Sequence, residues 1–237
     1  MSEFELNNIV SDIKSSTLNN KLSNKVKLIS YTKNANDDKN LEEIIAYCAR
    51  VSNPSNQINS QSNTKLIKYL IDNNHWSPFE MVSMCLEINT TRDIARQILR
   101  HRSFSFQEFS QRYSIASLGY EIREARLQDI KNRQNSLKTD DEDLKLKWEQ
   151  LQKEINDKSN DVYNWAISNG IAKEQARVVL PEGNTMSRLY VNGTLRSWIH
   201  YIKIRTDNGT QKEHIEIANE CANVISSIFP LIYEFVN

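Results

Sequence analysis

A row of arginines at helical spacing constrains this chain more than any other feature of its sequence. The row consists of Arg92, Arg96 and Arg100, and no Gly or Pro interrupts it. Ile94 and Ile98 lie between the arginines, so the spacing predicts a helix with three permanent positive charges on one face. Like charges four residues apart destabilise a helix by roughly a few tenths of a kcal/mol per pair. Carboxylates of the chain itself or a bound anion can offset that cost, and the sequence leaves both alternatives open.

The segment that begins at the last arginine of this row is dense in functional side chains. Arg100–Tyr113 reads RHRSFSFQEFSQRY and holds three arginines, one histidine, one glutamate and three serines. A guanidinium group is a planar fork that can bind a phosphate through two hydrogen bonds. Aromatic rings beside it offer flat apolar surfaces. The segment therefore predicts a site for a flat, phosphorylated ligand.

The charge balance limits the kinds of anion that this chain can bind. Thirty Lys and Arg residues balance thirty Asp and Glu residues, which gives a net charge of zero. A nucleic-acid-binding module is the competing hypothesis, in which the arginine row binds phosphates and Phe104, Phe106 and Phe109 stack on bases. Such modules are usually strongly basic, so we expect no nucleic-acid partner and a specific small anion instead.

The cysteines and the apolar segments exclude several other classes of protein. Cys48, Cys85 and Cys221 are far apart and show no CxxC or Cys/His spacing, so we expect neither disulfides nor a metal site. The N-terminus is polar, and no apolar run approaches about 18 residues. We therefore expect a cytoplasmic protein without a membrane partner.

The pattern of apolar residues predicts one mixed α+β domain over residues 25–237, with a charged helical insert at about 121–160. Residues 1–24 are polar and rich in Asn and Ser, which indicates a weakly ordered N-terminal arm. Strands are expected at 26–31 and 81–89, and irregular structure at 103–113. Helices are expected at 41–51, 64–73, about 92–101, 140–169, 173–180, 185–204 and from about 210 onward.

Two of these helices carry further signals. Thr139 with Glu142, and Thr210 with Glu213, have the spacing of capping boxes and predict where the 140–169 helix and the final helix begin. The apolar stripe of the 140–169 helix is Leu144, Trp148, Leu151 and Ile155.

Two isolated arginines stand at apolar positions. Arg205 follows Trp198 and Ile202 at helical spacing, and Arg177 precedes an apolar run. A buried arginine needs a partner, because an unpaired buried charge is costly. Each of the two therefore has an internal partner, extends its charged end to water or binds a ligand. No GxSxG, GxGxxG or Walker segment is present, and there are five glycines in all. If the chain is an enzyme, side chains must hold any cofactor that carries the chemistry.

Arg100-His101-Arg102, seven residues and Ser110 resemble the RHR-x7-S signature of flavin-dependent thymidylate synthases. The resemblance continues in Gln111–Ser114 (QRYS), in the His75 loop, in residues 176–181 (ARVVLP) and in residues 193–201 (GTLRSWIHY) with Arg205. These segments stand in the family's order and extend over most of residues 26–236.

The resemblance implies the family's α+β fold, with a mixed sheet packed against long helices, and a homotetramer. Its active sites would lie at subunit interfaces, each with FAD and dUMP. The implied reaction is the reductive methylation of dUMP to dTMP in de novo dTMP biosynthesis. The donor of the one-carbon unit would be 5,10-methylenetetrahydrofolate, and NADPH would reduce the flavin.

The resemblance also implies roles for individual residues. Arg205 would be catalytic, because a fixed cation at the uracil edge stabilises charge that develops on the ring. The residues implied in binding FAD are Ser52, Ser77 (from a neighbouring subunit), Arg100, His101, Arg102, Glu108, Thr194, Leu195, Arg196 and His200. The residues implied in binding dUMP are Gln97, Ile98, Leu99, Arg100, Glu108, Phe109, Ser110, Gln111, Arg112, Arg177 and Arg205.

The chain departs from the family pattern at two of these positions. Many members carry Asn where Thr194 and His200 stand, although both residues can still form hydrogen bonds to a flavin. An inactive relative that keeps the fold is the remaining alternative. Each motif position keeps a usable side chain, which favours the active enzyme.

Overall fold

The chain forms two compact units. The computed structural model describes residues 25–35 and 38–236, so the arm predicted for residues 1–24 lies outside the described residues. Unit 1 comprises Asn89–Arg100 and Glu108–Leu189 together with Lys25. Unit 2 comprises Val26–Ile88, His101–Gln107 and the C-terminal segment from Tyr190. The division falls inside the Arg100–Tyr113 segment, so this segment contributes residues to both units.

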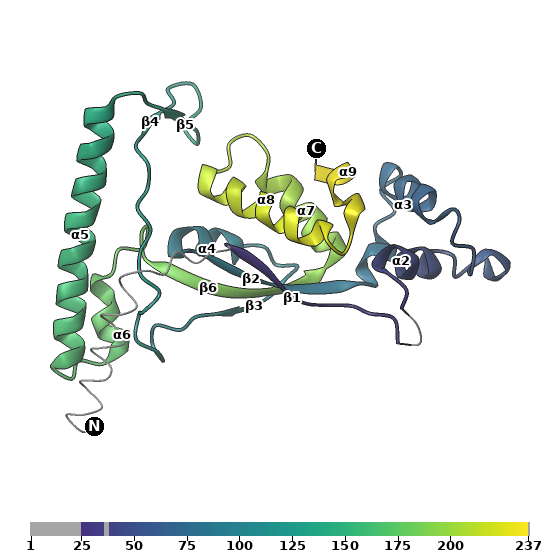
Figure 1. Cartoon of the computed structure of the whole chain (residues 1–237), viewed down its shortest axis with the longest axis horizontal. Helices are drawn as coiled ribbons and strands as arrows, with labels where there is room; N and C mark the ends of the chain where they lie inside the picture. Colours follow the sequence, from purple (N-terminus) through teal and green to yellow (C-terminus); the bar gives the residue numbers. More distant parts are fainter. Residues whose placement is uncertain (1–24, 36–37, 237) are drawn as a thin grey trace. The chain divides into compact units, whose positions relative to one another are not determined.

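A four-stranded sheet, in the order β1-β2-β6-β3, is the largest sheet among the described residues. Its strands are β1 (Val26–Tyr31), β2 (Ser83–Thr91), β6 (Met186–Thr194) and β3 (Ser105–Glu108). β1 pairs antiparallel with β2, from Val26 opposite Ile88 to Tyr31 opposite Met84. Figure 1 shows the sheet together with the helices. The mixed α+β class predicted from the sequence is confirmed.

Unit 2 has its core between the sheet and the helices α7 (Leu195–Arg205) and α8 (Lys212–Ser226). These helices pack against each other, and α8 also packs against β1. Leu86 and Ile88 of β2, Trp198 of α7 and Ile225 of α8 are at most 1% exposed. From Ser83 to Ile88 the buried residues of β2 alternate, because successive side chains of a strand point to opposite faces.

Unit 2 has further helical elements besides α7 and α8. They are α2 (Leu41–Ala49), α3 (Asn63–Asp72), α9 (Tyr233–Val236) and the 3-10 turns η1 (Pro54–Asn56), η2 (Ser77–Glu80) and η4 (Pro230–Ile232). At the start of α2 the Asn40 side chain accepts from Glu43 N at 3.0 Å, and the Glu43 side chain accepts from Asn40 N at 3.0 Å. α7 packs against η2, which brings the Ser77 turn beside the helix that carries Arg196 and His200.

Unit 1 contains the arginine helix and the longest helix of the described chain. Its helical elements are α4 (Arg92–Ile98), α5 (Glu142–Ser168), α6 (Lys173–Ala176) and the 3-10 turn η3 (Arg177–Val179). α5 packs against α6 and η3 (Figure 1). Tyr163 and Ala166 of α5 form an apolar cluster with Ala176 of α6. The cluster fixes the segment that leads into Arg177.

α5 confirms the long helix predicted at 140–169, but its apolar stripe is exposed in the single chain. We call the residues Leu144, Trp148, Leu151 and Ile155 the α5 stripe, and they are between 38% and 58% exposed. The buried face of the helix is polar instead and includes Gln152 at 4% and Asn156 at 2%. Both amides have hydrogen-bond partners, which removes the penalty of burying them.

The helix predicted at 185–204 is wrong in its first half. Residues 186–194 form strand β6, and the helix α7 begins at Leu195. Ser187, Leu189 and Val191 are buried at every second position, which is the period of a strand. The apolar residues of this segment fit both periods in the sequence, and pairing within the sheet selects the strand.

The predicted helical insert at 121–160 is helical only from Glu142 onward. Its first part contains a hairpin, β4 (Arg126–Gln128) and β5 (Ser136–Lys138). Asp129 closes the turn, because its carboxylate accepts from the backbone N of Lys131 at 2.8 Å and from Asn135 Nδ2 at 2.9 Å. An aspartate that binds the backbone two residues ahead favours a turn over a helix.

Both predicted capping boxes are wrong. The side chain that caps α5 is Asp141, which accepts from Leu144 N at 2.9 Å, whereas Thr139 accepts from Asp141 N. α8 begins after Gln211, and no side chain caps it through a hydrogen bond. In each case the helix begins one or two residues later than the Thr predicted, which changes the residue at the capping position.

Residues 105–108 form strand β3, although residues 103–113 were expected to be irregular. The backbone N of Phe109 continues the pairing by donating to Arg188 O at 2.9 Å.

None of the helices in the described part of the chain combines the length and the apolarity needed to cross a membrane.

We predict that Gly193→Ala destabilises the protein. A Cβ at Gly193 would lie 2.3 Å from Cδ1 of Phe104, and the Phe104 ring is itself packed 4.6 Å from the Trp198 ring. Overpacking of this kind lowers the free energy of unfolding by about 1–3 kcal/mol, which urea denaturation can measure. Gly183→Ala is the control, because nothing lies within 4 Å of that Cβ. Equal stability of the two variants would contradict the prediction.

Candidate active site

The arginine helix α4 confirms the helix predicted from the arginine row. Thr91 is its N-terminal flanking residue, but the Thr91 hydroxyl donates to Asp93 instead of capping a backbone group. Arg123 donates to Asp93 Oδ1 at 3.0 Å and also binds the Thr91 hydroxyl. The start of α4 is therefore held by an arginine from the 121–160 segment.

Carboxylates of the chain itself pair with the first two arginines of the row. Glu182 accepts from Nε of Arg92 at 3.1 Å and from Nε of Arg96 at 2.9 Å. Glu108 lies 3.7 Å from Arg92 Nη1 and 3.6 Å from Arg96 Nη1. Burial raises the pKa of Glu182, but the hydrogen bonds and charges of Arg96 and Arg92 outweigh it and lower that pKa below its ordinary value. Internal pairing thus explains Arg92 and Arg96, whereas the Arg100 side chain is exposed.

Unit 1 holds the residues implied in dUMP binding, with the exception of Arg205. Arg100, Ser110 and Arg112 are exposed, while Gln111 is 3% exposed and Ile98 is 1% exposed. The exposed members can reach a ligand directly with their side chains. The buried members are fixed by the packing around them.

The turn that carries Ser110 and Arg112 lies next to α6. The backbone N of Tyr113 donates to Ser110 O at 3.1 Å, and Lys173 Nζ donates to Tyr113 O at 3.0 Å. Arg112 Nη2 is 3.5 Å from Glu174, and both side chains are at least half exposed. The structure therefore brings Ser110 and Arg112 close to the segment that leads into Arg177.

Unit 2 holds the residues implied in flavin binding, with the exception of Arg100 and Glu108. Thr194 is the N-cap of α7 and accepts from Ser197 N at 3.3 Å. Leu195 is fully buried, and Arg196 forms an ion pair with Glu80 of η2. The exposed members of the set include Ser52, Ser77 and Arg102.

His200 and Trp76 form a ring pair beside the Ser77 turn. The two ring centroids lie 4.6 Å apart. Burial, with the charges of Arg196 and Lys203, lowers the pKa of His200, so its ring is neutral at neutral pH. α7 thus presents a cation and a neutral ring one turn apart next to η2.

Arg205 lies on the apolar stripe of α7 and has an internal partner, which is one of the alternatives that the sequence left open. Its Nε donates to Nε2 of His101 at 2.9 Å. Burial, and next the charge of Arg205, lower the pKa of His101 from 6.5 to about 4. His101 is therefore neutral at neutral pH, and since Nε2 accepts, its proton is on Nδ1. This histidine of the RHR segment orients the arginine that was predicted to be catalytic.

A buried tyrosine–histidine pair lies behind His101. The Tyr201 ring packs edge-on against the His101 ring at 4.9 Å, and the Tyr201 hydroxyl lies 3.1 Å from Nε2 of His214. His214 is 0% exposed, and burial, then Arg205 and His101, lower its pKa to about 3. Sequence reasoning missed His214, and its place three residues before the buried Ile217 was the available signal.

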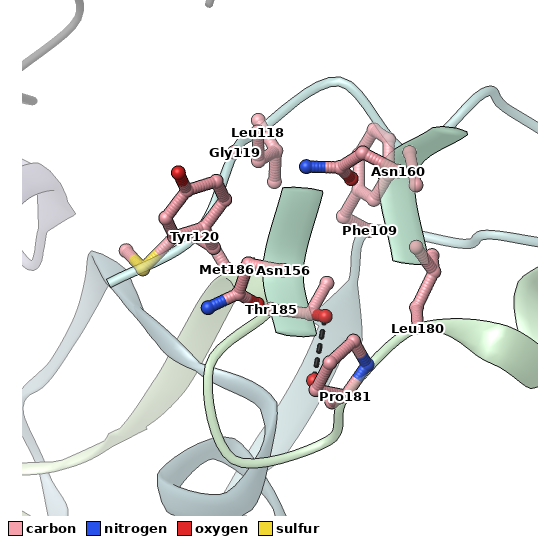
Figure 2. A pocket seen from close by; sticks show the side chains of 11 residues that line it. Phe109, Leu118, Gly119, Tyr120, Asn156, Asn160, Leu180, Pro181, Thr185 and Met186 are labelled. Carbon is pink, nitrogen blue, oxygen red and sulfur yellow. Dashed lines mark hydrogen bonds between the residues drawn. The ribbon is translucent and has the colours of Figure 1, made fainter. Parts of the chain in front are cut away.

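The cavity drawn in Figure 2 is too small for a nucleotide. Figure 2 shows Phe109 and Asn160 on one part of its wall, and Asn156 with the hydrogen bond from Thr185 to Pro181 O on another. The space open to water is about 20 Å³, which admits about one water molecule. Phe109 is the one residue of the implied dUMP set that lines it. The cavity therefore does not account for ligand binding.

Neither Cys85 nor Cys221 of unit 2 is an activated nucleophile. Burial raises the pKa of Cys85, and burial followed by the charge of Glu220 raises that of Cys221. A raised pKa keeps the thiol protonated, whereas reactive cysteines have lowered values. In the range that the structure describes, no group of three or more His, Cys, Asp and Glu residues is arranged to hold a metal ion.

Comparison with known proteins identifies the family. Residues 27–231 match the model of the family described as thymidylate synthase complementing protein. The chain belongs to this family. It is 54% identical over 191 residues to the flavin-dependent thymidylate synthase of Synechocystis, covering 81% of this chain and 87% of that relative. It is 52% identical over 207 residues to a probable flavin-dependent thymidylate synthase of Paramecium bursaria Chlorella virus 1, covering 87% and 95%.

The fold of this thymidylate synthase family member is similar to that of a solved enzyme. A crystal structure of a UMP/dUMP methylase from Streptomyces cacaoi, bound with 5-Br dUMP, superimposes with a TM-score of 0.74 and 26% identity. The similarity covers 88% of this chain and 92% of that one. The family predicted from the RHR-x7-S signature is confirmed.

We predict that the His101→Gln variant loses less stability than the wild type when the pH becomes acidic. In the unfolded chain His101 takes up a proton below about pH 6.5. In the folded protein its pKa is lowered to about 4, so protonation between these values favours the unfolded state. The stability that His101 contributes is complete above pH 6.5 and is lost as the pH falls toward 4. Glutamine keeps a neutral acceptor, so the melting temperature of the variant should fall less over this range.

The exposed His75 provides the matched control for this experiment. His75→Gln should follow the wild-type curve. Burial is the main cause of the lowered pKa of His214 and is present in each variant, so some pH dependence remains throughout. Parallel curves for wild type and His101→Gln would contradict the assigned role of His101.

Proposed function

We infer that this chain is a flavin-dependent thymidylate synthase, which converts dUMP into dTMP by reductive methylation. The observation that carries this conclusion is the identity of 54% and 52% to two relatives of that name over most of their lengths. The similar fold of a UMP/dUMP methylase supports a uracil nucleotide as substrate. The nucleic-acid hypothesis is less favoured, because carboxylates of the chain already pair Arg92 and Arg96.

The residues of unit 1 fit the phosphate end of dUMP. Arg112 and Ser110 are exposed on one short turn, and the nearby Arg177 is partly exposed. The contact of Arg112 with Glu174 is long at 3.5 Å and solvated, so a phosphate can replace it through a two-pronged hydrogen bond. We place dUMP against this turn, with Gln97, Gln111 and Glu108 as further contacts.

The side chains of unit 2 include hydrogen-bond donors of the kinds that suit FAD. The exposed Arg102 and the half-exposed Arg196 suit a pyrophosphate, and Ser77 and His200 offer hydrogen bonds beside them. Arg196 already pairs with Glu80, so its guanidinium has a fixed position before a ligand binds. A bound FAD supplies the reducing electrons, with NADPH as their source and 5,10-methylenetetrahydrofolate as the donor of the one-carbon unit.

We propose that Arg205 acts on the uracil ring. His101 takes one nitrogen of its guanidinium, and no other hydrogen bond or ion pair of the Arg205 side chain is found within the described chain. The terminal nitrogens thus stay available to a substrate. A cation fixed in this way stabilises the negative charge that forms on the uracil when N3 loses its proton, which makes C5 more nucleophilic.

We further propose that the enzyme is a homotetramer with active sites at the subunit interfaces. The exposed α5 stripe supports this assembly, because monomeric proteins seldom leave a continuous row of large apolar side chains in water. Trp165, on the same helix, is 62% exposed and extends the apolar surface. A cytoplasmic location stays a prediction from the sequence.

The proposed function predicts a yellow protein that makes dTMP. Purified protein supplied with FAD should show flavin absorbance that bleaches with NADPH under anaerobic conditions, faster when dUMP is present. With 5,10-methylenetetrahydrofolate added, chromatography should detect dTMP. A protein that neither retains FAD nor forms dTMP would contradict the proposal.

In the same assay Arg205→Ala should lower the rate of dTMP formation by about a hundredfold or more, the usual effect of removing a group that stabilises developing charge. FAD absorbance should remain. Lys203→Ala is the control, because Lys203 is exposed on the same helix. Near-normal turnover by Arg205→Ala would overturn the role given to Arg205.

The tetramer proposal predicts that charges on the α5 stripe cause dissociation. The double variant Trp148→Glu with Ile155→Glu should elute with a smaller mass than wild type when light scattering follows gel filtration. Lys147→Glu with Gln150→Glu, at exposed polar positions of the same helix, is the control and should keep the wild-type mass. A monomeric wild type, or an unchanged mass of the first variant, would contradict the proposal.

A further inference from the structure

Glu182 occupies an unusual position between two arginines of α4. Its Oε2 accepts from Arg92 Nε at 3.1 Å, and its Oε1 accepts from Arg96 Nε at 2.9 Å. One carboxylate thus accepts a hydrogen bond from the Nε atom of each guanidinium group. The Arg92 side chain is 8% exposed, whereas those of Arg96 and Glu182 are about half exposed. The buried arginine therefore depends on this contact more than its neighbour does.

The outer nitrogens of the same arginines are the ones near Glu108. Arg92 Nη1 lies 3.7 Å from Glu108 Oε1, and Arg96 Nη1 lies 3.6 Å from Glu108 Oε2. Both contacts are ion pairs, and their N–O distances are longer than those of a hydrogen bond. The Ser187 hydroxyl donates to Glu108 Oε1 at 2.8 Å and fixes the carboxylate from β6. Glu182 thus holds the arginines close to Glu108 without letting them close on it.

The loop that carries Glu182 is fixed at both ends. Thr185 N donates to Pro181 O at 3.0 Å, and Thr185 O accepts from Arg92 N at 2.9 Å. Asn184 Nδ2 donates to Gln152 Oε1 at 3.0 Å. Gln152 is a buried residue of α5, so the helix of the 121–160 segment helps to hold the loop. The position of Glu182 is therefore determined by the hydrogen bonds of its loop as well as by its contacts with the arginines.

We propose that Glu182 is a positioning residue of the thymidylate synthase reaction. It holds Arg92 and Arg96 so that Glu108 stays available to the flavin and dUMP. This inference deepens the proposed function and rests on it. The four side chains form a cluster of two positive and two negative charges. Without Glu182 both arginines turn to Glu108 and bind it directly, and the carboxylate is withdrawn from the ligands.

The sharpest test is chemical rescue of Glu182→Ala. Misplacement of a positioned group lowers turnover steeply, so kcat should fall about tenfold while FAD absorbance is retained. Sodium acetate should restore at least about half of the lost kcat, because its carboxylate fits between the two guanidinium groups. Sodium chloride at the same ionic strength should not. Acetate should not rescue Arg205→Ala, which lacks a cation.

Two further variants guard against misfolding. Glu182→Gln keeps the size of the side chain and should also lose about tenfold in kcat. Glu149→Gln removes an equally exposed carboxylate that pairs with Lys153, and it should behave as wild type. A kcat within about twofold of wild type in Glu182→Gln, or an equal response to acetate and chloride, would overturn the role of Glu182.

A measurement of stability, which does not depend on enzyme activity, separates this inference from the proposed function. The lowered pKa of Glu182 means that its contribution to stability is present at neutral pH and is lost as the pH falls below 4.5. The difference in melting temperature between wild type and Glu182→Gln should therefore shrink over that range. A wild type that makes no dTMP but shows this difference contradicts the proposed function alone. A constant difference contradicts the positioning role of Glu182.

Discussion

The pairing of the α4 arginines with Glu108 and Glu182 is the interaction on which the arrangement of unit 1 depends. Arg92 is nearly buried, and its charge cannot be removed by deprotonation. Two carboxylates, 16 residues downstream and 90 residues downstream, must therefore meet it in the folded chain. That requirement ties α4, β3 and the loop before β6 to one another.

Unit 2 meets a comparable requirement without a carboxylate. Arg205 is partly buried, and its described partner is a neutral histidine. A neutral acceptor orients the guanidinium and leaves its positive charge uncompensated. An aspartate in the same place would orient it equally well and would cancel much of the field that acts on a substrate. The two units thus treat their arginines differently, since one set is neutralised in place and the other keeps its charge.

Local patterns in the sequence predicted the elements that depend on local causes. Strand β1 has the predicted bounds, and α5 agrees to within two residues at its start, because both have a clear apolar period. Strand β6 was mistaken for a helix because Leu189 and Val191 suit either period, and the sheet decides between them. The caps failed for a similar reason, since Asp141 and Thr139 compete for one position.

The candidate site divides in the same way. The RHR-x7-S resemblance located His101 and Arg205, yet no spacing along the chain showed that their side chains meet. Glu182 and His214 were missed because their importance arises from contacts with residues far away in sequence. The spacing of His214 before Ile217 indicates a buried position, but a single sequence without relatives shows neither its partner nor the partners of Glu182. Distances in the folded chain are needed to find them.

The exposed stripe of α5 has a consequence for how the protein behaves at low concentration. The helix buries amides against its own unit and leaves tryptophan and isoleucine in water. In the proposed tetramer another subunit would cover those side chains, and mass action would then link folding to assembly. Dilution would lower the melting temperature, and newly made chains would be prone to aggregate until enough partners accumulate. The amount of protein in the cell would thus help to determine how stable each copy is.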